Sequence, residues 1–264
     1  VVEEDPETKK KSVKQIFPRY HQLDVVENLL ADVKENGIGK RYLIQHSAGS
    51  GKSNSISWLA HQLIGLEENG HPMLDSVLVV TDRRILDKQI RDNIKQFMQV
   101  ANTVAWAEHS GDLRDAIKDG KRIIITTIEK FPYVVPDIGA KHKDNKFAVI
   151  IDEAHSGQSG RNSAQMNLAL SGLASEDEMD NEDKINAMME GRKLLNNASY
   201  FAFTATPKNK TLETFGVPYQ DGDEIKHRPY HSYTMKQAIQ EGFILDVLKY
   251  YTPIASYYKL MKTV

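Results

Sequence analysis

Residues 41–53 read RYLIQHSAGSGKS, and this stretch decides the fold. It begins with the apolar run YLI at 42–44, which is typical of a strand buried on both faces. The loop that follows contains Gly49 and Gly51, which allow successive backbone N–H groups to converge on phosphate oxygens. A stretch with helical periodicity, SNSISWLAHQLIGL, starts at Ser53, and a helix N-terminus favours negative charge. The order of strand, glycine-rich loop and helix therefore predicts a nucleotide phosphate site.

The residues of this loop that we expect to contact a nucleotide are Ala48, Gly49, Ser50, Gly51, Lys52 and Ser53. Lys52 would meet the β- and γ-phosphates of ATP, and the Ser53 hydroxyl would bind the Mg²⁺ ion that bridges them. The strict pattern G-x-x-x-x-G-K-[ST] has glycine at the position of His46. We interpret His46 as a residue that packs the loop rather than as a catalyst. The alternative for the whole stretch is a chance glycine turn, which the flanking strand and helix disfavour.

Four more short apolar runs follow along the chain: VLVV (77–80), RIIIT (122–126), FAVII (147–151) and YFAFT (200–204). Helical stretches lie between the runs, notably RRILDKQIRDNIKQFMQV at 83–100. This alternation predicts an α/β fold with a mostly parallel, doubly wound sheet and helices on both faces. In such a sheet ligands bind beyond the carboxyl ends of the strands, so function is expected just after each run.

The run FAVII ends in Asp152, Glu153, Ala154 and His155, which places two carboxylates at the tip of a buried strand. We predict that Asp152 holds the magnesium ion through its water shell, and that Glu153 orients and deprotonates the attacking water. Capping of the next helix is the alternative for an isolated Asp-Glu pair. No second histidine stands at metal-ligand spacing from His155, so we interpret His155 as a coupling residue.

The last run, YFAFT, is followed by Ala205, Thr206 and Pro207. The hydroxyls of Thr204 and Thr206, with Ala205 between them, are candidates to sense the γ-phosphate through His155 or the carboxylates. On its own, this segment is a strand end followed by a proline.

Composition limits the remaining possibilities. The 264 residues allow one large domain, or one domain with an appendage, and the absence of cysteine excludes disulfides and thiolate chemistry. The net charge of −2 means that nucleic acid would have to bind a local patch. No apolar run approaches the roughly 20 residues that span a bilayer, and we expect a cytoplasmic protein without membrane contact. The first residue is Val1 rather than methionine, which suggests an excised fragment.

The chain divides into three expected parts. Residues 1–15 are expected to be disordered or a linker, residues 16–228 to form the ATP-binding domain, and residues 229–264 to connect toward an absent second domain. Within that last part, residues 234–251 predict a short helix, a turn at Gly242 and a strand.

Taken together, the motifs resemble those of superfamily 2 helicases and translocases. RYHQ (19–22) resembles the adenine-reading Q motif, GSGKS motif I, DEAH (152–155) motif II and TATP (204–207) motif III. QHSAGSGKS, VVTDRRILDKQI, TTIEKF, IIDEAHSGQSG and FTATP are similar to the first motor domain of the R subunit of type I restriction enzymes. The resemblance covers roughly residues 16–252 and implies a RecA-like P-loop NTPase fold.

The resemblance also implies roles and partners. Gln22 and Arg19 would read adenine, and the candidate contacts to the DNA backbone are Arg83, Arg84, Thr127 and Lys130. The motor would use ATP and Mg²⁺ to translocate double-stranded DNA, together with the methylation and specificity subunits of a restriction-modification complex. The family's nuclease and the arginine finger of its second motor domain would lie outside this chain, so the chain alone is expected to be a weak ATPase.

Three other readings stay open on the sequence. Another superfamily 2 motor, such as an RNA helicase or a DNA remodeller, shares most of these motifs. A small-molecule kinase also uses a GKS loop. A nucleotide-gated assembly module would bind ATP without hydrolysing it.

Overall fold

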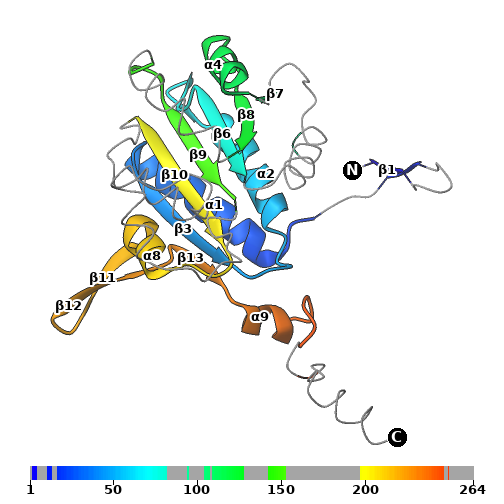
Figure 1. The fold of residues 1–264 in the computed structure, drawn as a ribbon, viewed down its shortest axis with the longest axis vertical. Helices are drawn as coiled ribbons and strands as arrows, with labels where there is room; N and C mark the ends of the chain where they lie inside the picture. Colours follow the sequence, from blue (N-terminus) through cyan, green and yellow to red (C-terminus); the bar gives the residue numbers. More distant parts are fainter. Residues whose placement is uncertain are drawn as a thin grey trace, which may run out of the picture.

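All five apolar runs form strands of one parallel sheet in the computed structural model (Figure 1). The structure describes residues 2–4, 11–13, 17–81, 94, 104–107, 109–127, 142–152, 197–246 and 249. In these ranges the central sheet has seven strands in the order β13-β3-β10-β9-β6-β8-β7. Every adjacent pair is parallel. Their bounds are β3 Arg41–His46, β6 Ser76–Thr81, β7 Val104–Trp106, β8 Ile123–Thr127, β9 Phe147–Ile151, β10 Ala198–Thr204 and β13 His231–Tyr233.

Side chains that alternate along these strands build two cores, one on each face of the sheet. On one face Ile44, Val79 and Phe203 pack with helices α1 (Tyr20–Asn36) and α2 (Lys52–Ile64). On the other face Leu43 and Val80 pack with α4 (Ser110–Lys118) and α8 (Asn209–Phe215). Since successive side chains of a strand point to opposite faces, runs buried at every position indicate a sheet covered twice. The doubly wound α/β fold is confirmed.

The smaller elements lie outside this sheet. Three two-stranded antiparallel sheets pair β1 (Val2–Glu4) with β2 (Lys11–Val13), β4 (Glu67–Glu68) with β5 (His71–Pro72), and β11 (Val217–Asp221) with β12 (Glu224–Arg228). The β11–β12 hairpin extends away from the central sheet (Figure 1). Helix α9 (Met235–Gln240) follows β13. Among the helices of the described ranges, none is both long and apolar enough to cross a lipid bilayer.

The structure differs from the sequence expectations near the ends. Strand β13 belongs to the central sheet, so the sheet extends past the expected boundary at residue 228. Residues 2–4 and 11–13 pair as strands inside the part expected to be disordered or a linker. After α9 the expected turn forms at Gly242, with φ of 74°, but residues 243–246 and 249 are not in a strand.

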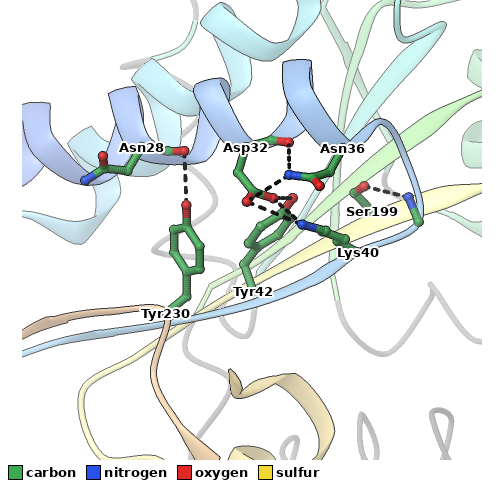
Figure 2. Close-up of polar contacts among 8 residues, drawn as sticks. Asn28, Asp32, Asn36, Lys40, Tyr42, Ser199 and Tyr230 are labelled. Carbon is green, nitrogen blue, oxygen red and sulfur yellow. Dashed lines mark hydrogen bonds and ion pairs between the residues drawn. The ribbon is translucent and has the colours of Figure 1, made fainter. Parts of the chain in front are cut away.

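Helix α1 is fixed to the sheet by polar contacts along its second half (Figure 2). The Tyr42 hydroxyl on β3 donates to Asp32 Oδ2 at 2.7 Å, and the Lys40 ammonium lies 3.1 Å from the same oxygen. The Tyr230 hydroxyl, just before β13, donates to the Asn28 carbonyl at 3.1 Å. These contacts hold the axis of α1 against the sheet edge and bring its N-terminal turn to the loop after β3.

Candidate nucleotide site

The loop between β3 and α2 has the backbone that the sequence predicts. Gly49 and Gly51 adopt φ of 74° and 82°, a left-handed conformation that side-chain-bearing residues rarely take. A Cβ on Gly51 would also lie 2.5 Å from Gln22 Nε2, so a larger residue would displace the Gln22 amide from the loop. Gly51 is the N-cap of α2, and the helix begins at Lys52. The glycines are therefore required by the loop's shape as well as by its approach to a ligand.

The first turn of α1 binds the carbonyl side of this loop. Gln22 Nε2 donates to the carbonyls of Ser50 and Gly51 at 3.2 and 3.0 Å, and His21 Nε2 lies 3.0 Å from the same Ser50 carbonyl. Arg19 Nη1 donates to the Gly49 carbonyl at 3.3 Å. In a peptide unit the N–H points away from the C=O, so these contacts aim the amides of Gly51 and Lys52 away from α1. That is the arrangement a phosphate needs.

The side chains of the loop fit an anionic ligand. Lys52 is buried, with 8 % of its surface exposed, and its ammonium lies 3.4 Å from the His46 carbonyl. Within the described residues, the buried hydroxyls of Ser47 and Ser50 have no hydrogen-bond partner. A buried polar atom without a partner carries a desolvation cost that a phosphate oxygen would remove. Ser53 is half-buried and Ala48 exposed.

The carboxyl ends of the neighbouring strands bring the other predicted residues to the same edge of the sheet. Strand β10 lies between β3 and β9, and Thr204 pairs with Gln45 of β3. The buried Thr204 therefore stands between the phosphate loop and the buried carboxylate Asp152, which follows β9. Ala205 is half-buried and Thr206 exposed. A coupling role for this segment fits its position between the two halves of the site.

Several predicted residues lie outside the described ranges: Glu153, His155, Arg83, Arg84 and Lys130. Thr127 is the last residue of β8, and β6 lies between β8 and the strand β9 that precedes Asp152. Thr127 is buried, with 3 % of its surface exposed. Its hydroxyl is closed off from a DNA backbone in this conformation.

The structure adds residues that the sequence analysis did not select. The His21 ring stacks on Tyr233 of β13 with ring centroids 3.6 Å apart. The Arg19 guanidinium lies 3.9 Å above the Phe243 ring, and the position of a Cβ on Gly49 is 3.4 Å from Ile244. The segment after α9 thus packs against the phosphate loop. His21 is adjacent to Gln22 in RYHQ, but no local pattern marks Tyr233 or Phe243, which lie more than 200 residues further along the chain.

The polar groups around the loop have shifted ionisation. Burial lowers the pKa of His21, and burial, with the Lys52 ammonium among the neighbouring groups, lowers the pKa of His46 to about 2. Burial and a hydrogen bond to Glu241 raise the pKa of Tyr233 to about 12. The imidazole of His46 is therefore neutral at any physiological pH, and the fixed positive charges at the loop are those of Lys52 and of Arg19, whose guanidinium contacts the Gly49 carbonyl.

Comparison with known protein families identifies the family to which the chain belongs. The model of the SWI2/SNF2 ATPase family matches residues 21–260, which is most of the chain. The chain belongs to the SWI2/SNF2 ATPase family. The chain is therefore a helicase-like ATPase domain.

Curated relatives of this SWI2/SNF2 ATPase are endonuclease subunits of type I restriction enzymes. The SsaAORF53P subunit of Staphylococcus saprophyticus is 27% identical over 234 residues, 86% of this chain and 21% of the relative. The HindI subunit of Haemophilus influenzae is 26% identical over 90% of this chain and 21% of the relative. The putative MjaIXP subunit of Methanocaldococcus jannaschii is 29% identical over 78% of this chain and 16% of the relative. The resemblance to this family is confirmed, and the chain spans about a fifth of the length of these relatives.

Solved structures similar to this ATPase include two DNA-related proteins. One is a nuclease-deletion mutant of the Type ISP restriction-modification enzyme LlaGI in complex with a DNA substrate mimic. Its TM-score is 0.49 at 18% identity, covering 89% of this chain and 22% of that one. The other is the UvsW helicase from bacteriophage T4, with a TM-score of 0.43 at 16% identity, covering 77% and 60%.

Proposed function

We propose that this domain is the ATP-driven motor of a type I restriction endonuclease subunit and that it couples ATP hydrolysis to translocation along double-stranded DNA. The observation that supports it best is the phosphate loop: α1 binds its carbonyls, and the same loop contains the buried Lys52 and, among the described residues, two buried serine hydroxyls without a hydrogen-bond partner. The type I restriction relatives supply the reaction in which such a motor would act.

Hydrolysis in this proposal uses residues from two strand ends. Lys52 binds the β- and γ-phosphates, and Ser53 with Asp152 holds Mg²⁺, which neutralises charge that develops on the phosphates. Glu153 follows Asp152 in the sequence and accepts a proton from the attacking water. Arg19 and Gln22 contact the adenine. Gln22 Oε1 accepts from the Arg19 N–H at 2.8 Å and has a second lone pair with which it would accept from the adenine amine.

Motion and DNA contact involve the other strand ends. Thr204, Ala205 and Thr206, with His155, transmit the state of the γ-phosphate to the rest of the domain. Arg83, Arg84 and Lys130 contact DNA phosphates, together with Thr127 at the end of β8. Methylation and specificity subunits complete the complex. The relatives are about five times longer, and we propose that a nuclease and an arginine finger lie outside this chain, which leaves the chain alone a slow ATPase.

Calorimetric titration with ATPγS and Mg²⁺ tests the nucleotide site. Lys52→Ala should reduce affinity at least tenfold, because a buried cation that faces the phosphates is lost, while Glu153→Gln should bind as wild type and lose turnover. Lys40→Ala is the matched control, because Lys40 pairs with Asp32 at the other end of α1. Equal affinity of wild type and Lys52→Ala would reject the site. ATP turnover that duplex DNA does not stimulate, in a protein that also phosphorylates a small molecule, would favour the kinase reading.

A further inference from the structure

His46 occupies the position where the strict phosphate-loop pattern has glycine, and its whole side chain is buried. The ring meets Phe203 edge-on, with centroids 6.3 Å apart, on the core face of the sheet. An imidazole enclosed in this way needs partners for its two nitrogens, because an unpaired buried polar atom destabilises the fold.

A hydrogen-bonded chain supplies one such partner. His46 Nε2 lies 2.8 Å from Nδ1 of His231 on β13, and His231 Nε2 lies 2.9 Å from Asp24 Oδ2 on α1. The chain links the phosphate loop to two elements that are 22 and 185 residues away in the sequence. The His231 side chain is only 13 % exposed and His46 is fully buried, so the bond between the two rings is largely protected from competing water, whereas the Asp24 side chain is 38 % exposed.

The chain is compatible with both protonation states of His231. In the charged state, His231 donates from Nδ1 to His46 and from Nε2 to Asp24. In the neutral state, His231 still donates to Asp24, and His46 donates to Nδ1. Because burial lowers the pKa of His46, its ring stays neutral and can act as acceptor or as donor.

The backbone of His46 is where this chain reaches the reaction. The His46 carbonyl lies 3.4 Å from the Lys52 ammonium, and the N–H of Ser47 donates to the Tyr233 carbonyl at 2.9 Å. Strand β13 therefore holds both the His46 ring, through His231, and the next peptide group, through Tyr233. A shift of His46 relative to β13 would move the carbonyl that Lys52 faces.

We propose that Asp24 and His231 are positioning residues of the ATPase site: they fix the His46 ring, and with it the start of the phosphate loop and the resting place of the Lys52 ammonium. This inference rests on the proposed binding of ATP at the loop. Where the strict phosphate-loop pattern has a glycine, this chain has His46, whose ring is held by hydrogen bonds that connect β3, β13 and α1.

A metal site does not explain the cluster. Within the part of the chain that the structure describes, no group of three or more His, Asp or Glu side chains is placed to hold a metal ion. The nitrogens of His46 and His231 face each other at hydrogen-bond distance, which leaves no room for an ion between them.

Two isosteric substitutions at His231 separate positioning from simple packing. The amide of asparagine reaches the place of Nδ1, which faces His46, whereas the amide of glutamine reaches the place of Nε2, which faces Asp24. We expect His231→Asn, which keeps the contact to His46 and loses the contact to Asp24, to bind ATPγS and Mg²⁺ about two- to threefold more weakly than wild type, as Asp24→Ala should. His231→Gln, which loses the contact to His46, should bind about three- to tenfold more weakly, the loss expected for one hydrogen bond. Thermal unfolding checks that both variants are folded.

Asp24 is tested through its dependence on His231. Asp24→Ala should weaken nucleotide binding in the wild-type background and add nothing in His231→Ala, because the two residues act in series. Asp32→Ala is the matched control: Asp32 lies on the same helix and accepts from a side chain of the sheet, but far from the loop (Figure 2). It should lower the melting temperature and leave nucleotide affinity unchanged.

The outcomes distinguish the two proposals. If wild type binds ATPγS, Lys52→Ala does not, and the two His231 variants bind equally well, then the ATP site stands and the positioning role is wrong. If wild type and Lys52→Ala bind equally, or neither binds, the ATP site itself is rejected, and the inference with it.

Discussion

At the scale of single residues, His46 should couple the stability of the domain to pH. Its pKa is lowered to about 2 in the folded protein, against an ordinary value of 6.5, and burial also lowers the pKa values of His21 and His61. These side chains bind protons more readily in the unfolded chain. Their contribution to stability is therefore fully present above pH 6.5 and is lost progressively as the pH falls, for His46 over the whole range down to about 2.

Urea denaturation between pH 7.5 and 5.5 measures this effect. We expect the free energy of unfolding to decrease toward pH 5.5, with a limiting slope of about 1.4 kcal/mol per pH unit for each such histidine. His46→Gln removes one titrating group and should reduce the slope by up to about 1.4 kcal/mol per pH unit, the contribution of one proton. The same slope in wild type and His46→Gln would show that other groups govern the acid response.

His46 also illustrates which features of the site the sequence does not predict. The phosphate loop could be predicted because strand, glycines, Lys52 and helix lie within one short stretch. The side chains that hold the loop could not, since His231 and Phe243 come from segments without periodicity and reach the loop only through tertiary structure. His46 was predicted to pack the loop, and its complete burial agrees with that, but the partner of its ring has no sequence signal.

At the scale of elements, the contacts between α1 and the sheet predict a measurable loss on deletion of one hydroxyl. Tyr42 is buried with 1 % exposed, and burial with the Asp32 carboxylate raises its pKa. Tyr42→Phe leaves Asp32 without its 2.7 Å hydrogen bond, and we expect a loss of about 1–2 kcal/mol of unfolding free energy.

Chemical denaturation at pH 7 with an unchanged m-value checks this prediction. Tyr219→Phe is the control, because Tyr219 lies on the exposed β11–β12 hairpin, and it should change stability by less than about 0.5 kcal/mol. If both variants were equally stable, α1 would be held by its apolar face alone.

The sequence predicts some strands of the sheet better than others. Strands β6, β8, β9 and β10 are buried at every position, and β3 contains the buried apolar run YLI, so their composition predicts them. Strands β7 and β13 are three residues long and lie at the two edges of the sheet, where only part of each side chain is buried. Such a segment has neither the length nor the pattern of a central strand, and β13 was accordingly assigned to the connecting segment.

At the scale of the whole molecule, the net charge of −2 bears on how this domain would bind DNA. The protein has no general electrostatic attraction for a polyanion, so binding must come from a few local cations at the strand ends. We expect weak binding to duplex DNA without sequence preference, through Arg83, Arg84, Lys130 and nearby backbone groups.

Salt dependence tests this expectation directly. Each neutralised phosphate contributes about −0.9 to the slope of log affinity against log salt, so two or three contacts predict a slope of about −2 to −3. Changing both Arg83 and Arg84 to alanine should flatten the slope by about 2 and leave ATPγS affinity unchanged. Replacing Lys226 and Arg228 on the exposed hairpin removes the same charge from a different surface, and should change the slope little. Tight, sequence-selective and salt-insensitive binding would contradict the prediction, because it requires base contacts in a groove, and the proposed contacts reach only phosphates.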